Sequence, residues 1–362
     1  MSEDLTQRHS AFRFHGTWQE FAAIAFPNLL LSIVTLGIYR FWATTREREY
    51  LWGKTDFIDE RLEWTGRGIE LFIGFVMVFL LLGLPFIAVQ LVNNGLIFRD
   101  EVYMVIAINI LLFTLIFYLT GVAYFRALRY RLSRTYWRGI RGGSDDPGFQ
   151  YGLSYMWKSF AGWLPIFLMV PWSMISLWNE RWNAMSFGPH RFVATAEWKP
   201  LMKRYLLFYL VPFLLFAGGA FVGISVAISG DTPDALGGAG AAIGVIFVIL
   251  AVLGIYIILP LAALAFYSKY FRLAVGGLRL HNLEFEFRAR APDWILFFLA
   301  NMAIIICTLG IGYIFMPYRS WKFFVDHMEA YGEINIDELT QSATIVSKHG
   351  EGLLDAFDVG AI

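Results

Sequence analysis

The stretch Asn28–Arg46, NLLLSIVTLGIYRFWATTR, recurs at Asn301–Arg319 as NMAIIICTLGIGYIFMPYR. In both copies an Asn stands seven positions before a Thr-Leu-Gly-Ile box, and an Arg follows the Thr of the box by eleven positions. The two copies align without a gap. Repetition of this kind in an apolar chain predicts a membrane protein assembled from duplicated units. We therefore expect function to arise from the set of repeats and not from one catalytic cleft.

The composition is that of a membrane protein. The 362 residues are 57% hydrophobic and 16% charged, with a mean hydropathy of +0.55, which is more apolar than a soluble core of this length requires. A helix of about 20 apolar residues crosses a hydrocarbon layer of about 30 Å. The segments of about this length are 18–39, 69–92, 102–125, 159–178, 205–228, 239–267 and 293–315. The single cysteine, Cys307, excludes an intrachain disulfide framework.

The basic residues distinguish two topologies. If all these segments cross the membrane, Lys and Arg divide almost evenly between the two sides. If the repeated segments that begin at Trp18, Ser159 and Asp293 each enter and leave on one face, only Arg99 of the 29 basic residues lies on the opposite face. The positive-inside rule favours this second arrangement, with both chain termini cytoplasmic.

We therefore predict an all-α polytopic membrane protein with internal repeats. It has four spanning helices, three re-entrant or kinked hydrophobic hairpins and short cytoplasmic β-strands. The hairpins are expected to break at Pro27-Asn28, at Pro165 or Pro171, and at Asn301, where side-chain amides can satisfy freed backbone groups. The alternative is seven full crossings by proline-kinked helices. Helices that lie flat at the interface are disfavoured, because these segments have no charged face.

Short strands are expected before and after each repeat, because aromatic residues alternate with polar ones there. The expected strands are Phe12-Arg-Phe-His-Gly, Phe149-Gln-Tyr-Gly and Leu283-Glu-Phe-Glu-Phe before the repeats, and residues 62–64, 192–195 and 334–336 after them. The predicted organisation is a first repeat at residues 1–140, a diverged second repeat at 141–280, a hairpin-only third repeat at 281–337 and an acidic tail at 338–362. The middle repeat keeps Pro171-Trp172 and Arg181 but lacks the Thr-Leu-Gly box, so its register stays open.

The run 126–141 is rich in Arg, Tyr and Trp and directly follows an apolar segment. Basic and aromatic residues at such a position typically anchor a helix end among anionic headgroups, at about 1 kcal/mol per basic residue. We predict this role and not nucleic-acid binding. The predicted headgroup anchors are Arg129, Arg131, Arg134 and Arg138.

No sequence signature of an enzyme is present. The chain lacks His-Glu-x-x-His, a phosphate-binding glycine loop, a nucleophile elbow and a cysteine pair. No charged residue lies at the centre of an expected spanning segment, which disfavours a proton-coupled carrier. We therefore expect no catalytic residues, no metal and no cofactor.

The chain resembles the YjgN-like family of bacterial inner-membrane proteins. The resemblance is carried by the Phe-x-Phe-x-Gly stretch from Phe12, the box at Thr35–Tyr39, Trp42, Arg46 and the ending Glu351-Gly-Leu-Leu-Asp-Ala-Phe-Asp-Val-Gly. It covers nearly the whole chain. It implies a multi-pass protein of the bacterial inner membrane with no assigned activity, and an association with membrane-linked metallopeptidases.

We predict a transport-like protein for a neutral or amphipathic solute or a lipid. The alternative is a non-transporting scaffold or adaptor for a membrane protein partner, such as a membrane-linked metallopeptidase. The candidate midplane polar site consists of Asn28, Asn301, Gly37 and Gly310. The residues that define the repeat motif are Thr35, Tyr39, Trp42, Arg46, Thr308 and Arg319. Interhelical hydrogen bonding is the simpler explanation for the two asparagines.

Overall fold

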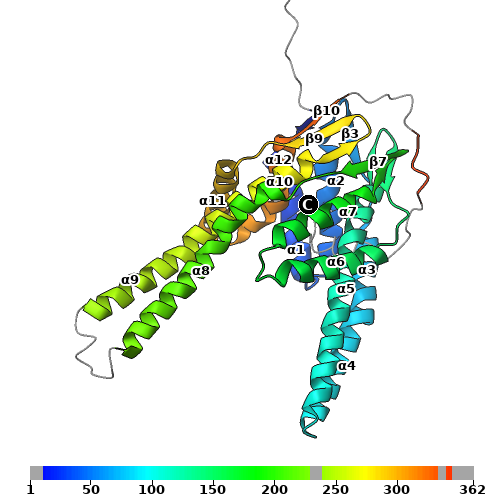
Figure 1. The fold of residues 1–362 in the computed structure, drawn as a ribbon. Helices are drawn as coiled ribbons and strands as arrows, with labels where there is room; N and C mark the ends of the chain where they lie inside the picture. Colours follow the sequence, from blue (N-terminus) through cyan, green and yellow to red (C-terminus); the bar gives the residue numbers. More distant parts are fainter. Residues whose placement is uncertain (1–10, 229–238, 333–339, 345–362) are drawn as a thin grey trace, which may run out of the picture.

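The computed structural model of the chain describes residues 11–228, 239–332 and 340–344. Within them, ten short strands pair in chain order, each antiparallel to the next (Figure 1). The strands are β1 (Phe12–Phe14), β2 (Thr55–Phe57), β3 (Glu60–Trp64), β4 (Thr135–Trp137), β5 (Ile140–Gly143), β6 (Ser186–Phe187), β7 (His190–Ala194), β8 (Leu278–Leu280), β9 (Leu283–Phe287) and β10 (Met328–Tyr331). Because β10 lies close to β1, the sheet curves into a nearly closed ring, which we call the strand ring.

The interior of the strand ring is filled by apolar side chains. Phe57, Trp137, Phe192, Leu280 and Leu283 come from five different strands and belong to one buried cluster. Pairing of neighbouring strands places such side chains opposite one another, for example Leu62 opposite Trp137 and Phe192 opposite Leu280. The centre of the strand ring is therefore a packed hydrophobic core.

The helices are inserted between neighbouring strands of the ring. Three short helical hairpins occupy one set of insertions. Hairpin 1 is α1 (Trp18–Val34) and α2 (Arg40–Gly53), hairpin 2 is α6 (Phe149–Trp163) and α7 (Val170–Asn183), and hairpin 3 is α11 (Ala291–Cys307), the 3₁₀ turn η3 (Ile311–Phe315) and α12 (Met316–His327). They connect β1 to β2, β5 to β6 and β9 to β10.

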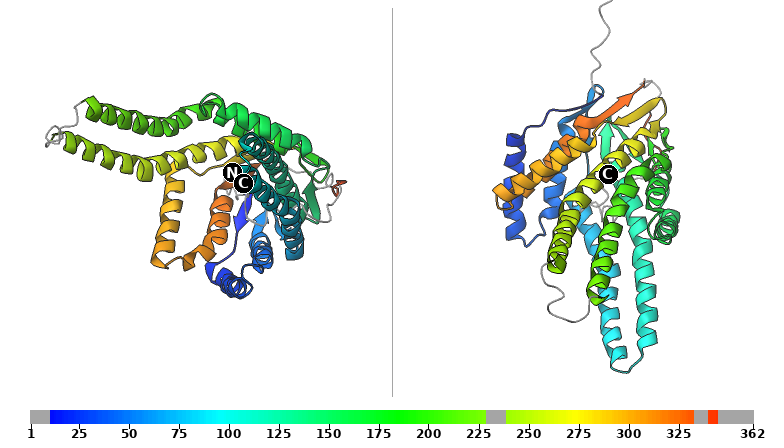
Figure 2. Two further views of the ribbon diagram at one scale, coloured as in Figure 1. Left: turned by 90° about the horizontal axis from the view of Figure 1, so that it is seen from below. Right: turned by 60° about the vertical axis from the view of Figure 1, so that its left-hand side comes forward.

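Two longer insertions project from the same edge of the ring (Figure 1). The first arm joins β3 to β4 and contains α3 (Gly68–Val78), the π-helical turn η1 (Phe79–Gly83), α4 (Leu84–Ile97) and α5 (Val102–Arg134). The second arm joins β7 to β8 and contains α8 (Lys199–Ile228), α9 (Ala239–Leu253), the π-helical turn η2 (Gly254–Ile258) and α10 (Leu259–Gly276). Seen from below, hairpins and arms surround a common centre (Figure 2).

The prediction of an all-α fold is wrong, because the strand ring organises the whole chain. Four of the expected strands are present as β1, β3, β7 and β9, whereas Phe149-Gln-Tyr-Gly begins helix α6, and residues 334–336 lie outside the described part of the chain.

The prediction of four spanning helices is also wrong. Within the described residues, three helices are long and apolar enough to cross a membrane, namely Val102–Arg134, Lys199–Phe221 and Val245–Gly276. The expected span at 69–92 is divided by η1 into two shorter apolar helices. Each π-helical turn directly precedes a Leu-Pro pair, Leu84-Pro85 or Leu259-Pro260. A proline lacks the N–H that would bond to the preceding turn and crowds a carbonyl there, so the helix widens locally.

The predicted break of hairpin 1 at Pro27-Asn28 is wrong as well, because α1 continues through Pro27 to Val34. The chain reverses instead at the Thr-Leu-Gly box, where Leu36 and Gly37 adopt φ of 51° and 90°. In hairpin 3 the break is not at Asn301 but at Leu309 and Gly310, with the same two φ values. Glycine tolerates this left-handed conformation, which side chains rarely adopt. Hairpin 2 turns at Ile166 and Phe167, with φ of 50° and 64°, directly after Pro165 and well before Pro171.

Candidate functional site

Each hairpin contains one polar link between its two helices. In hairpin 1, Nδ2 of Asn28 donates to the Glu47 carboxylate and to the Ala43 carbonyl, both at 3.4 Å. In hairpin 3, Oδ1 of Asn301 accepts from Nε of Arg319 at 2.5 Å. The two asparagines of the candidate midplane site are thus each held by their own hairpin.

Hairpin 2 has an equivalent link that the sequence analysis missed. Nζ of Lys158 lies 2.5 Å from the Glu180 carboxylate. Lys158 stands eight positions before Ile166, the first left-handed residue of its turn, just as Asn28 precedes Leu36 and Asn301 precedes Leu309 by eight. This spacing supplies the register that the missing Thr-Leu-Gly box left open. The signal in the sequence was a polar residue at that distance before the turn.

These links lie in partly or fully buried surroundings. Asn28 is only 3% exposed, and its Oδ1 has no hydrogen-bond partner among the described residues. A buried amide oxygen without a donor costs about 1–3 kcal/mol. A polar atom kept buried at this cost marks Asn28 as a candidate contact for a polar group of a ligand.

The other members of the candidate site, Gly37 and Gly310, lie at the hairpin tips. A Cβ built on either glycine meets no atom within 4 Å. The neighbouring Leu36 and Leu309 are each 94% exposed. The structure therefore separates the glycines, which form the tips, from the asparagines, which lie within the helical part of each hairpin. Whether the four residues line a solute path stays a prediction.

The threonines of the repeat motif cap the first helix of their hairpins. The Thr35 hydroxyl donates to the Leu31 carbonyl at 2.7 Å and accepts from the Tyr39 N–H at 2.9 Å. The Thr308 hydroxyl makes the equivalent bonds to the Ile304 carbonyl at 2.6 Å and from the Gly312 N–H at 2.7 Å. Both threonines satisfy backbone groups that a helix end leaves unpaired.

The aromatic and basic members of the motif pack beside the hairpin 1 turn. Tyr39 stacks on Trp42, with ring centroids 6.3 Å apart, and the Arg46 guanidinium lies 5.7 Å from the Tyr39 ring centroid. In hairpin 3 the corresponding Arg319 forms the polar link to Asn301 described above.

The predicted headgroup anchors make contacts within the protein. Arg134 forms an ion pair with Glu70 at 2.9 Å, and Arg138 pairs with Asp59 in the neighbouring strand turn. Arg129 donates to the Asp146 carbonyl at 2.6 Å. Arg131 lies in the last turn of α5. Lipid binding by these arginines stays a prediction, and the contacts of Arg129, Arg134 and Arg138 also brace the base of the first arm.

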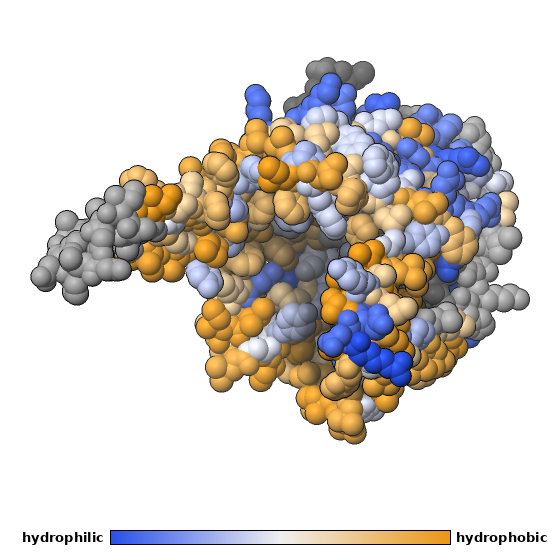
Figure 3. All heavy atoms as spheres, turned by 60° about the horizontal axis from the view of Figure 1, so that its bottom comes forward, coloured by the Kyte–Doolittle hydropathy of each residue, from blue (hydrophilic) through white to orange (hydrophobic). Residues whose placement is uncertain are grey.

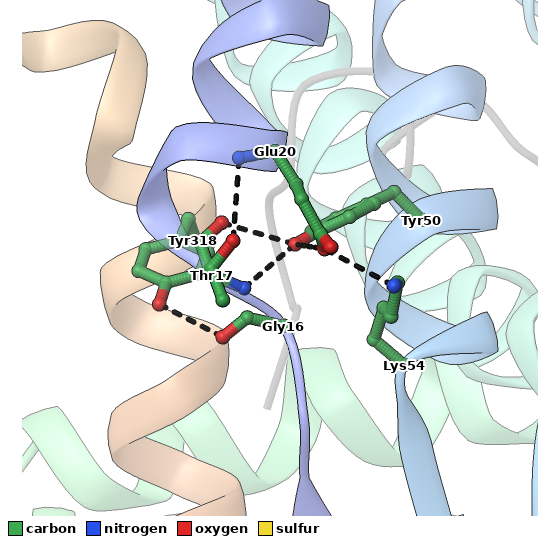
Figure 4. Close-up of polar contacts among 6 residues, drawn as sticks. All are labelled: Gly16, Thr17, Glu20, Tyr50, Lys54 and Tyr318. Carbon is green, nitrogen blue, oxygen red and sulfur yellow. Dashed lines mark hydrogen bonds and ion pairs between the residues drawn. The ribbon is translucent and has the colours of Figure 1, made fainter.

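A polar network ties hairpin 1 to hairpin 3 near the strand ring (Figure 4). The Tyr50 hydroxyl accepts from the Thr17 N–H at 2.9 Å and lies 2.9 Å from the Glu20 carboxylate, which also pairs with Lys54 at 3.1 Å. Tyr318 of α12 donates to the Gly16 carbonyl at 3.2 Å. Burial, followed by the hydrogen bond to Glu20, raises the pKa of Tyr50 to about 12. The hydrogen bonds from Lys54 and Tyr50 lower the pKa of Glu20. The network therefore pairs a protonated phenol with an ionised carboxylate at neutral pH.

A hollow lies between the arms and hairpins on the side away from the strand ring. Figure 3 shows it surrounded by apolar side chains, with hydrophilic ones visible inside. The filled core of the strand ring lies at its other end. This arrangement has room for a molecule that enters from the apolar side, and it offers polar groups within.

Comparison with known proteins places the chain in a family. A family model described as "Bacterial protein of unknown function (DUF898)" matches residues 9–356. The chain belongs to this family. Two similar proteins carry the name "Inner membrane protein YjgN", which confirms the resemblance seen in the sequence. The protein from Escherichia coli strain K12 is 35% identical over 63 residues, and the protein from Escherichia coli O157:H7 is 36% identical over 62 residues.

Each of these matches covers 17% of this chain and 16% of the relative, so the similarity spans about a sixth of the relatives' length. No solved structure matches the chain. The family, the named relatives and the apolar helices together identify a membrane protein of unknown function. In the described part of the chain, no group of three or more His, Cys, Asp or Glu side chains is placed to hold a metal ion.

Proposed function

We propose that this protein is a multi-pass protein of the bacterial inner membrane that takes up a lipid or another amphipathic molecule in the hollow between its arms and hairpins. Its three hairpins enter the bilayer from the strand-ring side and return to it. The strand ring and both termini are cytoplasmic. The proposal includes no catalytic step and no cofactor.

The observation that carries the proposal is the combination of apolar hairpin tips with a hollow that faces them. Leu36 and Leu309 stand fully exposed at the tips, and Ile166 is exposed at the turn of hairpin 2. Leaving such side chains in water costs about 1.5–3 kcal/mol each relative to burial. A bilayer removes this cost, and the hollow then opens toward lipid while the packed strand ring closes its other end.

The basic residues support the proposed orientation. Most of them lie in the strands, in the strand turns and in the adjacent helix ends, whereas Arg99 lies in the turn at the far end of the first arm. Arg40 follows the tip of hairpin 1 and is exposed. A long arginine side chain at that depth can extend its charged end toward an interface.

Cysteine labelling tests the orientation. In a Cys307→Ser background, single cysteines replace Asn282 in a strand turn, Glu101 at the far end of the first arm and Leu36 at a hairpin tip. We expect a water-soluble maleimide to label the first from the cytoplasm, the second from the opposite side, and the third poorly from either side. Labelling of Leu36→Cys from the side that labels Glu101→Cys would mean that hairpin 1 crosses the membrane.

Lipid movement tests the function. The purified protein is reconstituted into vesicles that contain a fluorescent phospholipid, and dithionite quenches the outer leaflet. We expect the protected fraction to decay faster than in empty vesicles. The double variant Asn28→Leu, Asn301→Leu should slow this decay, whereas the matched double variant Asn94→Leu, Asn282→Leu, at exposed positions, should not. Decay no faster than in empty vesicles would overturn the transport-like function.

The packed core of the strand ring favours a second candidate function, a membrane scaffold. Its ring of paired strands is a firm platform for a protein partner such as a membrane-linked metallopeptidase. Co-expression with such a peptidase and purification through a tag on this chain tests the idea. Recovery of the two proteins in a fixed ratio supports the scaffold, and their separation in mild detergent argues against it.

A further inference from the structure

Four basic side chains gather where the second arm meets the strand ring. Arg204 lies near the start of α8, Lys269 and Arg272 lie near the end of α10, and Arg290 directly precedes α11. Arg204 donates to the Ala265 carbonyl at 2.8 Å, which ties the start of α8 to the turn of α10 before Lys269. The Ser268 hydroxyl donates to the Ala289 carbonyl at 3.3 Å, which places Arg290 beside the same turn of α10. Like charges repel, so this gathering favours the binding of an anion.

No carboxylate of the described residues forms an ion pair with any of the four. Arg204 donates to the Ala265 carbonyl at 2.8 Å, and Arg272 donates to the Ser268 carbonyl at 3.3 Å. Asp293 uses its carboxylate to accept the backbone N–H of Arg290 at 2.7 Å. Each guanidinium carries five N–H donors, so most of the donors in this group are left for another acceptor.

The first arm shows how the same positions are satisfied internally. Arg126 and Arg129 stand nine and six residues before β4, as Lys269 and Arg272 stand before β8. In the first arm, a loop from the strand ring supplies the acceptors: Arg126 donates to the Pro147 carbonyl at 3.1 Å and Arg129 to the Asp146 carbonyl at 2.6 Å. In the second arm the corresponding loop, between β9 and α11, accepts a hydrogen bond from Ser268, but among the described residues none of its carbonyls accepts one from Lys269 or Arg272. The second arm therefore has the cations without the loop acceptors of the first arm.

The surroundings of the group match a phospholipid. Arg204, Lys269 and Arg272 are half-buried. On the side away from the strand ring, α8 exposes Leu207 and α10 exposes Tyr267 next to the charges. A phosphate can bind the basic groups while acyl chains lie along the exposed apolar helix surfaces. The position at the base of a membrane helix is also where anionic headgroups are found.

We infer that Arg204, Lys269, Arg272 and Arg290 form a binding site for the phosphate of an anionic phospholipid at the base of the second arm. The site does not rest on the proposed function, because it does not involve the polar links of the hairpins. It holds whether or not a lipid moves through the hollow.

The test is a titration of the purified full chain, in a neutral detergent, with dioctanoyl phosphatidylglycerol. Native mass spectrometry measures the fraction of the protein that has bound the lipid. The variant Lys269→Gln, Arg272→Gln removes two charges of the site. The control variant Lys199→Gln, Lys203→Gln removes two exposed charges from the same arm. We expect the site variant to weaken binding about 30-fold, which corresponds to about 1 kcal/mol per basic residue, and the control to bind as the parent does.

Two further measurements distinguish the source of the phosphate. Dioctanoyl phosphatidylcholine, which has the same chains and no net charge, should bind no better to the parent than to the site variant. Inorganic phosphate at millimolar concentration should not displace the phosphatidylglycerol. Displacement of phosphatidylglycerol by inorganic phosphate would mean that the four basic residues bind a free anion. If both glutamine variants weakened phosphatidylglycerol binding equally, the binding would be general charge attraction and not a specific site. Either result overturns the lipid site.

Discussion

The guanidinium of Arg141 in β5 donates to the hydroxyl of Thr344 at 3.1 Å and also to its backbone carbonyl. Arg141 is only 6% exposed, and it donates to the Ser342 carbonyl as well. Gln341 accepts the Arg141 backbone N–H at 3.2 Å and donates to the Gly139 carbonyl at 2.8 Å. Residues 340–344 are therefore fastened to the strand ring at the turn between β4 and β5. The remainder of the predicted acidic tail, including residues 351–362, lies outside the described residues.

Arg141→Ala should release residues 340–344 from the strand ring. Hydrogen bonds from a charged donor contribute about 1.5–3 kcal/mol each, so amide exchange in this segment should rise about tenfold or more. Hydrogen–deuterium exchange with mass spectrometry measures this directly. Arg191→Ala, at an exposed position on β7, serves as the control. Unchanged exchange in the Arg141 variant would mean that other contacts hold the segment.

Trp321→Ala should destabilise the seam between hairpins 1 and 3. The Trp321 ring stacks on Trp52 with centroids 3.9 Å apart, and its Nε1 donates to the Thr55 hydroxyl at 2.8 Å. Removing a fully buried tryptophan costs about 3–5 kcal/mol. Because Trp321 is partly buried, we expect a loss below this range. Thermal unfolding in mild detergent should show a clearly lower midpoint than for Tyr313→Ala, which truncates an exposed aromatic residue of the same hairpin. Equal midpoints would show that this seam adds little to stability.

Reversing the charge of Lys158 should lower the stability of the protein, and exchanging the charges of Lys158 and Glu180 should restore it. Lys158→Glu alone places two carboxylates where the structure has an ion pair, and the loss of stability should be about 1–3 kcal/mol. Glu180→Lys in the same chain should recover most of this loss, because the pair is restored in reverse. Midpoints of thermal unfolding for the parent, both single variants and the double variant measure the coupling. Additive losses would argue that the two side chains do not interact in the membrane.

Stability should fall at alkaline pH through Tyr50. The folded protein holds the phenol proton with a pKa of about 12, against 10.0 for an unperturbed tyrosine. The folded state therefore keeps a proton that the unfolded state loses, so the contribution of Tyr50 is complete below pH 10 and is lost as the pH rises from about 10 to about 12. The stability difference between the parent and Tyr50→Phe should shrink over this range. Below pH 10 the difference should stay constant, because the folded and the unfolded chain both keep the proton of Tyr50.

The sequence predicted the polar positions of the hairpins better than their geometry. Asn28 and Asn301 were recognised from their matched spacing, and both take part in links between helices. Pro27 was taken as the break, because a proline inside a helix usually kinks or breaks it, but α1 continues through Pro27 to Val34. Prolines are tolerated in membrane helices where neighbouring groups satisfy the freed backbone. The actual reversal needs two left-handed residues and a threonine cap, and the repeated Thr-Leu-Gly box had contained that information.

The strand ring was only partly predictable. Strands such as β6, Ser186–Phe187, are too short for a period of two to be recognised. One of the two partners of β6, β5, is also separated from it in the sequence by hairpin 2. The alternation of aromatic and other residues at Phe149-Gln-Tyr-Gly predicted a strand, but these residues begin helix α6. Phe149, Leu153 and Trp157 are all exposed and recur every four residues, which is the spacing of one face of a helix. Four residues were too few to separate the two periods.

Because the ten strands pair in chain order, the sheet can form progressively during biosynthesis. Each strand from β2 to β9 can pair with the preceding strand once it leaves the ribosome, after any intervening hairpin or arm has been synthesised. β1 is different, because one of its edges faces β10, the last strand to be synthesised. Until then, the first hairpin stands beside an open edge, and a chaperone or a neighbouring chain can occupy it. A chain truncated before β10 would keep the three helices that are long and apolar enough to cross a membrane in the described residues, but it would lack the strand that lies beside β1.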